Sequence, residues 1–411
     1  MPAISPFSAL MPDADNVDRV SAVPYDVVDR DEAAALAEGN PLSLLHASRP
    51  EIDLPPETDP YADQVYEAAA AAFDRLRREA PLTVDDAPHL YVYAINARGH
   101  CQTGLMAAAD VDDYDSGAIR IHEKTRRTKE DDRTRHILAT RSHSGPVFLL
   151  YRACDGINSR ITDICAADPH FDFTAEDGSR HRLWRCPDEH TAALQTAFAE
   201  VPCFYVADGH HRAKAASRTR EECRAANPDH RGDEAYNRFL CVLFPHDQLR
   251  ILPYNRVVHD LNGHTPEGIL DALKERFALA PTQKPAPEAK GRVHVYLQQQ
   301  WYRLELPLPA ADQAGSVAET LDAAVLQEHV LAPLLGIDDP RRSTRIEFVG
   351  GIHGPERLVQ MVDDGRGMIA FSMFPTSVDE LMAISDNDEI MPPKSTWFEP
   401  KLRDGLAIHC F

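Results

Sequence analysis

The stretch Cys203-Phe204-Tyr205-Val206-Ala207-Asp208-Gly209-His210-His211-Arg212 decides the interpretation of this sequence. Apolar, β-prone residues run to Ala207, Asp208 and Gly209 interrupt them, and the following segment 213–218 has a helical composition. The pattern predicts a strand, a tight turn and a helix. A helix start presents unpaired amide groups at the positive end of the helix dipole, which suits an anion such as phosphate.

The polar residues of this turn have the chemistry of an anion site. Gly209 allows close approach of the backbone, and Asp208 can cap the helix or hold a metal ion. His210, His211 and Arg212 supply hydrogen-bond donors. An N-capped helix with solvated polar side chains is the simpler alternative. No permanent zinc site is expected, because the spacing of the acid and the histidines lacks a fourth ligand.

Composition limits the function classes. The chain has 411 residues, 43% apolar residues and a formal net charge of −22, so we expect a globular protein of two or three domains that binds neither nucleic acid nor anionic membranes. The sequence has no run of 18 apolar residues, and its N-terminal segment lacks a basic region followed by an apolar core, so we expect neither export nor a membrane span. The eight cysteines form no C-x-x-C pair, which favours reduced thiols and a cytoplasmic location.

The segments before and after the turn predict a sheet. A β-hairpin is expected over 90–107, and strands over 146–151, 204–207, 239–244 and 251–258, the last with an edge or bulge at Pro253. Thr128 and Asp131 resemble a capping arrangement for a helix that ends near Arg141.

A second part is expected from about residue 260. Its pattern predicts helices over 266–279, 316–335 and 378–385, and strands over 292–297, 301–306, 345–350 and 368–374. This alternation indicates a smaller α+β domain. We therefore predict two domains, 1–260 and 261–411.

Three other polar clusters are candidate sites. A dense charge cluster runs from His122 to Arg133, and a solvated helix face is its alternative. His46 and Arg49 follow an apolar run, where a water-exposed loop is equally compatible. Lys394, Ser395 and Thr396 lie between prolines and could form a rigid anion-binding loop or a plain surface turn. The sequence lacks the P-loop, dinucleotide-binding, G-x-S-x-G and H-E-x-x-H motifs.

Five motifs, in this order, carry a resemblance to a known family. They are Val23-Pro24-Tyr25-Asp26-Val27, Asn40-Pro41 through His46 to Arg49-Pro50, His122-Glu123-Lys124-Thr125, Asp208-Gly209-His210-His211-Arg212 and Met391-Pro392-Pro393-Lys394-Ser395-Thr396. The chain resembles the uncharacterised family called domain of unknown function 1015, with a core similar to the ParB/sulfiredoxin-like superfamily and especially its free serine kinases. The resemblance implies an α+β fold with a nucleotide-binding core, flanking mixed α/β elements and a smaller C-terminal α+β part.

The resemblance also implies a function. A small-molecule kinase acting on a hydroxyl, such as that of free serine, would use Mg²⁺ with ATP or ADP and no permanent metal. Glu123 would be the general base, with His122, Asp208, His210 and His211 as further catalytic residues and Asp208 as the transient Mg²⁺ ligand. The implied phosphate or nucleotide contacts are Gly209, Arg212, Lys124, Thr125, Lys129 and Arg133, and the possible substrate contacts are His46, Arg49, Lys394, Ser395 and Thr396.

Two alternatives remain open at this point. The same residues could hydrolyse a phosphomonoester such as phosphoserine, because kinases and phosphatases share a phosphate site. A nucleotide-binding regulator without turnover is the other. A sulfiredoxin-type reaction is disfavoured, because Gly209 and His210 occupy the position of the catalytic cysteine. The substrate, the phosphate donor, the direction of transfer and the oligomeric state are not determined by the sequence.

Overall fold

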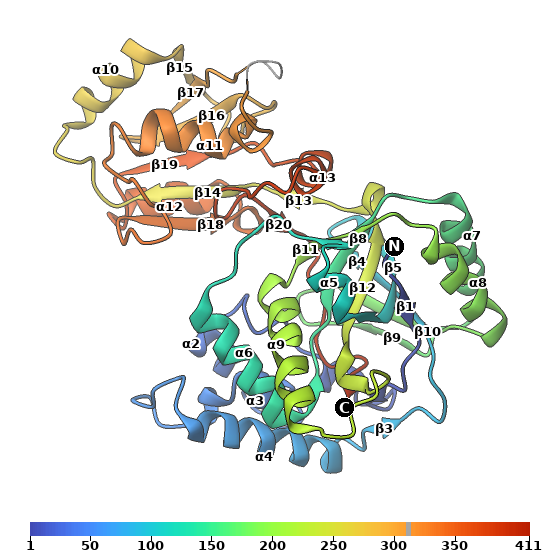
Figure 1. The fold of residues 1–411 in the computed structure, drawn as a ribbon. Helices are drawn as coiled ribbons and strands as arrows, with labels where there is room; N and C mark the ends of the chain where they lie inside the picture. The colour runs from blue at the N-terminus through green and yellow to red at the C-terminus, as the bar shows by residue number, and fades with distance from the viewer. Residues whose placement is uncertain (310–313) are drawn as a thin grey trace. The chain divides into compact units, whose positions relative to one another are not determined.

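The structure, a computed structural model, describes residues 1–309 and 314–411. The chain has a mixed α/β fold and divides into two compact units (Figure 1). Unit 1 contains residues 1–249 and 400–411, and unit 2 contains residues 250–399. These units differ from the predicted ranges 1–260 and 261–411 in that the final segment belongs to unit 1. That the two ranges are separate domains stays a prediction.

A nine-stranded, mostly antiparallel sheet forms the centre of unit 1. Two of its strand pairs are parallel, β6 with β11 and β8 with β12. Eight strands follow the order β6 (Ile119–Arg120), β11 (Phe204–Asp208), β8 (Val147–Tyr151), β12 (Arg238–Pro245), β5 (His100–Asp110), β4 (Tyr91–Ala97), β10 (Arg180–Arg185) and β9 (Phe171–Thr174), and β1 (Ile4–Ser5) pairs with β5.

The predicted hairpin is confirmed as β4 and β5. Ala97 pairs with His100, so Arg98 and Gly99 form a two-residue turn. Both turn residues have positive φ values, 51° and 74°, which is the geometry that matches the right-handed twist of a tight hairpin.

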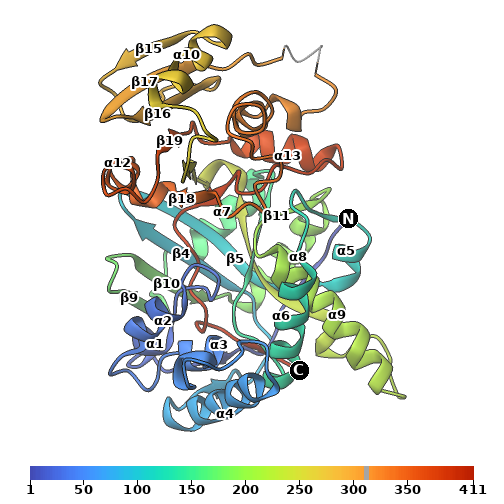
Figure 2. The ribbon, with the colours of Figure 1, turned by 90° about the vertical axis from the view of Figure 1, so that its left-hand side faces the viewer.

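Helices pack against this sheet and also form a cluster of their own. Residues of α7, α8 and α9 share one hydrophobic cluster with the strands, and α2, α3 and α4 form a second cluster. Figures 1 and 2 show α6 and α9 side by side. The helices are α1 (Val17–Val20), α2 (Arg30–Ala37), α3 (Leu45–Ser48), the 3-10 helix η1 (Pro50–Asp53), α4 (Asp63–Glu79), α5 (Val111–Asp115), α6 (Arg127–Thr140), α7 (Asp155–Ile164), α8 (Asp188–Ala199), α9 (His210–Ala226), η2 (Ala235–Asn237) and η3 (His246–Gln248).

The capping arrangement predicted for α6 is wrong. The helix begins at Arg127, and its N-cap residue Arg126 makes no side-chain capping bond. Asp131 instead forms ion pairs with Arg127 and Arg218. The Asp131 carboxylate thus joins α6 to α9 through Arg218, a contact that a local capping pattern does not predict.

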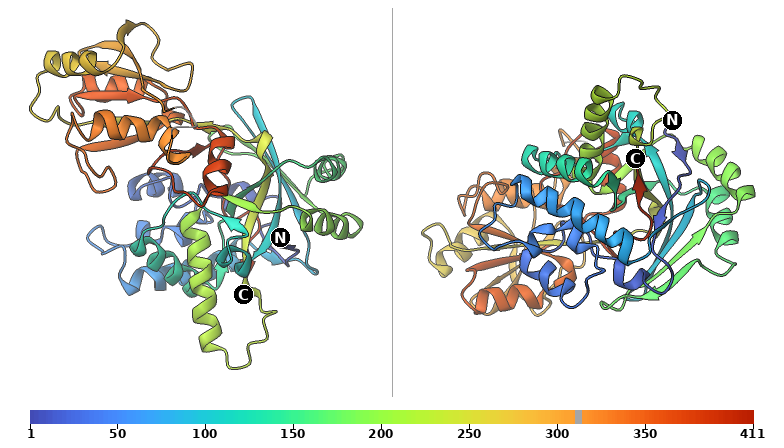
Figure 3. Two further views of the ribbon diagram at one scale, coloured as in Figure 1. Left: turned by 45° about the horizontal axis from the view of Figure 1, so that its top comes forward. Right: turned by 90° about the horizontal axis from the view of Figure 1, so that it is seen from below.

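Both ends of the chain lie in unit 1, as Figure 3 also shows. The segment 400–411 contributes β21 (His409–Cys410), which pairs with β7 (Ser142–His143). The short strands β2 (Leu10–Met11) and β3 (Thr83–Val84) also pair. All eight cysteines are free.

A six-stranded sheet forms the centre of unit 2. Its order is β15 (Leu279–Thr282), β17 (Gln300–Glu305), β16 (Arg292–Leu297), β19 (Ile369–Ser372), β14 (Tyr254–Val258) and β18 (Ile346–Gly350). A separate pair joins β13 (Ile251–Leu252) to β20 (Trp397–Phe398). The helical elements are α10 (Pro266–Arg276), η4 (Ala318–Thr320), α11 (Asp322–Leu326), the π-helical turn η5 (Gln327–Leu331), η6 (Gly351–His353), α12 (Glu356–Asp363) and α13 (Val378–Asp386).

Two predictions for this region are wrong. The segment 251–258 does not extend the first sheet, because Pro253 separates β13 from β14 and β14 pairs with β18 and β19. The single helix predicted over 316–335 is divided into η4, α11 and η5. Among the helices in residues 1–309 and 314–411, none combines the length and apolar composition needed to cross a bilayer.

Candidate anion-binding site

The predicted strand, turn and helix are confirmed as β11, Gly209 and α9. Gly209 is the N-cap residue of α9 and has φ 91° and ψ 29°, a left-handed conformation that glycine adopts without a steric penalty. Its carbonyl accepts the amide of Ala213 at 3.0 Å. Because glycine has no side chain, it cannot cap the first-turn amides of the helix.

The parallel pairing of β6 with β11 brings the His122-Glu123 motif to this turn. Phe204 pairs with Ile119 and Tyr205 with Arg120, so the residues after both strands emerge at the same edge of the sheet. The ring centroids of His122 and His210 are 4.5 Å apart, with an angle of 89° between the ring planes. Two motifs separated by more than 80 residues therefore meet at the start of α9.

Burial favours the neutral form of both histidines. His122 is 2% exposed and His210 is 5% exposed. Burial lowers the pKa of His122 to about 4, although Asp208 and a backbone hydrogen bond with Val206 favour protonation. Burial, followed by the neighbouring His122, also holds the pKa of His210 well below its ordinary value.

Each of these rings has a nitrogen that forms no hydrogen bond in the part of the chain that the structure describes. Among the described residues, Nδ1 of His122 and Nε2 of His210 are buried without a hydrogen-bond partner. A neutral imidazole donates from one nitrogen and accepts at the other. Since leaving such atoms unsatisfied is costly, the pair is suited to a polar ligand at the start of α9.

Lys401 is a site residue that the sequence analysis missed. Its Nζ donates to Oδ2 of Asp208 at 2.9 Å, and the amide of Gly209 donates to Oδ1 at 3.0 Å. Burial favours the neutral acid, but Lys401 and then Arg212 outweigh it and hold the pKa of Asp208 well below its ordinary value. No local signal could have found this contact, because the partners are 193 residues apart.

The arrangement does not fit Mg²⁺ held by Asp208. The Lys401 ammonium already lies where a cation would bind the carboxylate. Within the described parts of the chain, no group of three or more histidine, cysteine or acidic side chains is placed to hold a metal ion.

Arg212 lies beside Gly209, and two of its three guanidinium nitrogens bind the protein interior, whereas its buried Nε has no hydrogen-bond partner among the described residues. Its Nη1 donates to the carbonyl of Pro146 at 2.5 Å, and its Nη2 pairs with Asp26 at 3.2 Å. Burial alone would lower the pKa of Arg212, but Asp26 and Asp404 raise it above its ordinary value. The predicted phosphate contact is thus mainly engaged within the protein. His211 is also engaged, because its Nε2 accepts the amide of Arg126 at 3.1 Å.

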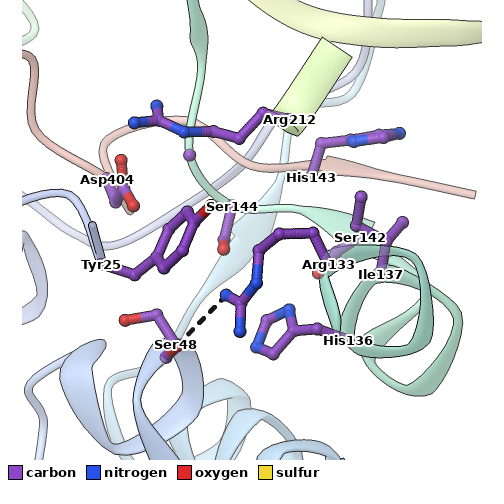
Figure 4. Close-up of a pocket in the computed structure, with 11 residues that line it drawn as sticks. Tyr25, Ser48, Arg133, His136, Ile137, Ser142, His143, Ser144, Arg212 and Asp404 are labelled. Atoms are coloured by element: carbon purple, nitrogen blue, oxygen red, sulfur yellow. Dashed lines mark hydrogen bonds between the residues drawn. The ribbon is translucent and has the colours of Figure 1, made fainter. Parts of the chain in front are cut away.

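Arg212 lines a small cavity of about 40 Å³ (Figure 4). Tyr25, Arg133 and Asp404 also face it, and the Arg133 guanidinium lies 4.0 Å from the centre of the Tyr25 ring. Asp404 is 2% exposed, and burial raises its pKa to about 7. The cavity is far smaller than the 300 Å³ or so of ordinary metabolite pockets.

The predicted phosphate contacts from the charge cluster are dispersed. Lys124 is exposed, and the hydroxyl of Thr125 donates to Glu130 at 2.5 Å. Arg133 is buried and paired with Asp132 at 3.0 Å. Glu123 is half-buried and follows directly after His122.

The predicted substrate contacts lie in three different environments. His46 is engaged by Asp53 at 2.8 Å, and Arg49 donates to the carbonyl of Tyr25 at 3.1 Å. Lys394, Ser395 and Thr396 belong to unit 2. There the hydroxyl of Ser395 donates to Pro392 at 2.8 Å, and the ammonium of Lys394 lies 5.2 Å from the centre of the Tyr254 ring.

The family described as "Protein of unknown function (DUF1015)" matches residues 4–324. The chain belongs to this family. No curated protein matches the chain.

Three solved structures with which this DUF1015 protein aligns share 11–13% sequence identity with it. A variant of a free serine kinase in complex with AMP has a TM-score of 0.35, and the alignment covers 74% of this chain and 92% of that one. SbnI from Staphylococcus aureus, truncated at its C-terminus, gives 0.36, with coverages of 74% and 87%. A conserved hypothetical protein from Pyrococcus furiosus gives 0.35, with 74% and 94%.

Proposed function

We propose that unit 1 is a small-molecule kinase, transferring a phosphoryl group from a nucleotide to a hydroxyl such as that of free serine. The observation that carries the proposal is the pair His122 and His210 at the start of α9. Both rings are more than nine-tenths buried, and each has an unpartnered nitrogen. The helix start adds amide donors and the positive end of its dipole, which together favour phosphate oxygens.

The proposed roles follow from charge and position. Neutral His210 donates a hydrogen bond from its free Nε2 to a phosphate oxygen, and Lys401 supplies positive charge beside Asp208. The free Nδ1 of His122 is an acceptor, because its other nitrogen is engaged by the Val206 backbone. Glu123, next to His122 in the sequence, takes the proton from the substrate hydroxyl as the hydroxyl oxygen attacks the terminal phosphorus of the nucleotide; the bond from that phosphorus to the bridging oxygen breaks, and the nucleotide leaves with one phosphate fewer. The resemblance to free serine kinases supports this role and a hydroxy amino acid as the substrate.

Arg212 has a different role in this proposal from the one expected for a phosphate contact. It supports the turn from inside through Asp26 and Pro146. No step is assigned to Mg²⁺, because the Asp208 carboxylate already has Lys401 as its cation.

The test is turnover by the full chain with ATP or ADP and serine, followed by phosphorus NMR. Glu123→Gln should lower turnover by about 10²- to 10⁴-fold, the contribution of a positioned base, and should change nucleotide affinity by no more than a few-fold. Glu222→Gln, an exposed acid on α9, is the matched control and should retain wild-type turnover.

The other outcomes identify the alternatives. Release of phosphate from phosphoserine without nucleotide would indicate a phosphatase, and nucleotide binding without any product would indicate a regulator. If calorimetry finds that the wild type binds neither nucleotide nor phosphate, the phosphate site itself is refuted.

A further inference from the structure

We propose that unit 1 contains a second anion site, a pocket near Tyr61 that binds a small metabolite with a doubly charged phosphate or dicarboxylate head. The pocket has a volume of about 350 Å³ and is lined by residues between Tyr25 and Arg133. This volume lies within the range of small-molecule pockets, about 300–1,000 Å³. We call it the Tyr61 pocket.

The lining of the Tyr61 pocket has an excess of positive charge. Its four cationic side chains are Arg30, Arg49, Lys129 and Arg133, and its two carboxylates are Glu51 and Asp132. The whole chain carries a formal charge of −22, so a cationic lining is opposite to the general field of the protein. Such local reversal of charge favours an anionic ligand.

Internal ion pairs account for only part of this charge. Arg49 pairs with Glu51 at 2.9 Å and Arg133 with Asp132 at 3.0 Å. Within the described residues, Arg30 and Lys129 have no acidic partner within 4.0 Å. Two positive charges therefore remain for a ligand, and a dianion matches them.

Arg30 is held in place for this role. Its Nη1 donates to the carbonyl of Pro56 at 2.8 Å, and its Nη2 donates to that of Leu54 at 2.5 Å. A guanidinium has five N–H donors, so others remain for an anion. The fixed side chain loses little conformational entropy on binding.

The remaining lining suits an uncharged ligand body. The Lys129 ammonium lies 5.7 Å from the centre of the Tyr61 ring. Val65 and Pro60 provide apolar surface. The pocket thus combines a cationic end with an apolar wall, as expected for a small phosphorylated or dicarboxylic metabolite.

The Tyr61 pocket is distinct from the start of α9. Tyr25 and Arg133 line both this pocket and the small cavity beside Arg212, so their stacked side chains lie between the two spaces. The proposal does not depend on the kinase reaction, because a ligand can occupy this pocket with or without phosphoryl transfer.

The experiment is calorimetry of the full chain at low ionic strength with O-phosphoserine, malate and inorganic phosphate as separate probes. The wild type should bind a phosphate monoester or a dicarboxylate with a millimolar or tighter Kd, and the better probe identifies the head group. Lys129→Glu should weaken that binding by about tenfold or more, because it removes a charged hydrogen bond and adds a like charge. Lys129→Met should give a smaller loss.

Arg78→Glu is the matched control, because it makes the same charge change at an exposed residue in the last turn of α4. Its affinity should stay within twofold of the wild type. The proposal is overturned if the wild type binds none of the probes at millimolar concentration, or if Lys129→Glu binds as tightly as the wild type. Probe binding that depends on Lys129 in a protein without nucleotide turnover would retain this site and refute the kinase.

Discussion

The starts of α2 and α9 differ in how the unpaired amide groups of their first turns are capped. At α2, the Asp29 side chain accepts the amide of Glu32 at 2.9 Å, and the Glu32 side chain accepts the amide of Asp29 at 2.9 Å. At α9, Gly209 provides no side-chain acceptor, and the neighbouring polar side chains turn to distant partners. The start of α2 is therefore capped by its own side chains, whereas the start of α9 has no side-chain cap for its first-turn amides.

This difference separates a structural helix start from a candidate site. An uncapped start alone would not suffice, because α4 and α8 also lack a side-chain cap. The start of α9 differs because the rings of His122 and His210 meet there, and each has a buried nitrogen without a hydrogen-bond partner in the described chain. The three predictions below test whether the residues around this start support the fold, the ligand or both.

The largest effect is expected for Arg212→Ala. Removal of the buried guanidinium leaves Asp26 and Asp404 without their main positive neighbour, so the free energy of unfolding should fall by about 3–5 kcal/mol. Urea denaturation followed by circular dichroism measures this change. Arg127→Ala, which breaks a pair with Asp131 whose side chains are 78% and 45% exposed, should cost less than about 1 kcal/mol.

A loss below 1 kcal/mol for Arg212→Ala would contradict the interior role. In that case the guanidinium would be available to a ligand, as the sequence alone suggested. Nucleotide affinity measured on the same variant would then decide between the two roles.

The strand, the turn and the helix at the centre of unit 1 could be predicted because their signals are local. A run of apolar residues ends sharply at Asp208 and Gly209, which predicts the end of the strand and a turn. The positive φ of Gly209 is one that glycine adopts readily because it has no side chain. The direction of the polar side chains could not be predicted. Asp208 contacts Lys401, and Arg212 contacts Asp26. In each pair the two residues are more than 180 positions apart in the sequence, so the topology of the whole unit brings them together.

Local signals also fail to predict which sheet a strand joins and which side chains share a pocket. Strand β14 has the pattern of a strand, and it was predicted as one. Its sheet was assigned wrongly, because only pairing with β18 and β19 determines which core it joins. In the same way, Arg49, Lys129 and Arg133 were predicted as anion contacts, but their common pocket depends on how α3, α4 and α6 pack.

The next effect concerns pH and the neutral histidines. His122 has an ordinary pKa near 6.5 in the unfolded chain and about 4 in the fold, so the unfolded chain binds more protons between these values. Its contribution to stability is therefore complete above pH 6.5 and is lost as the pH falls towards 4. Between pH 7 and 5, this one group should lower the free energy of unfolding by about 2 kcal/mol.

The variant His122→Gln should have a correspondingly flatter profile in urea denaturation at pH 5, 6 and 7. Asp404 acts with the opposite sign, because its raised pKa of about 7 makes the folded state bind the extra proton as the pH falls. An Asp404→Asn variant should therefore show a steeper loss of stability towards acid than the wild type. Identical profiles for wild type and His122→Gln would mean that His122 is not held neutral by burial.

The smallest effect on stability, and the sharpest test of the comparison, is Gly209→Ala. A Cβ here would approach no atom closer than 3.5 Å, so the cost comes from the positive φ and should be about 1–2 kcal/mol. Gly39, beyond the end of α2, has φ 70° with open space around it, so Gly39→Ala should cost a similar amount. Only Gly209→Ala should also weaken nucleotide binding, because a change of its backbone moves the first-turn amides of α9. Calorimetry and urea denaturation on both variants measure the two effects separately. If Gly209→Ala binds nucleotide like Gly39→Ala at equal stability, the start of α9 is a structural helix start like that of α2.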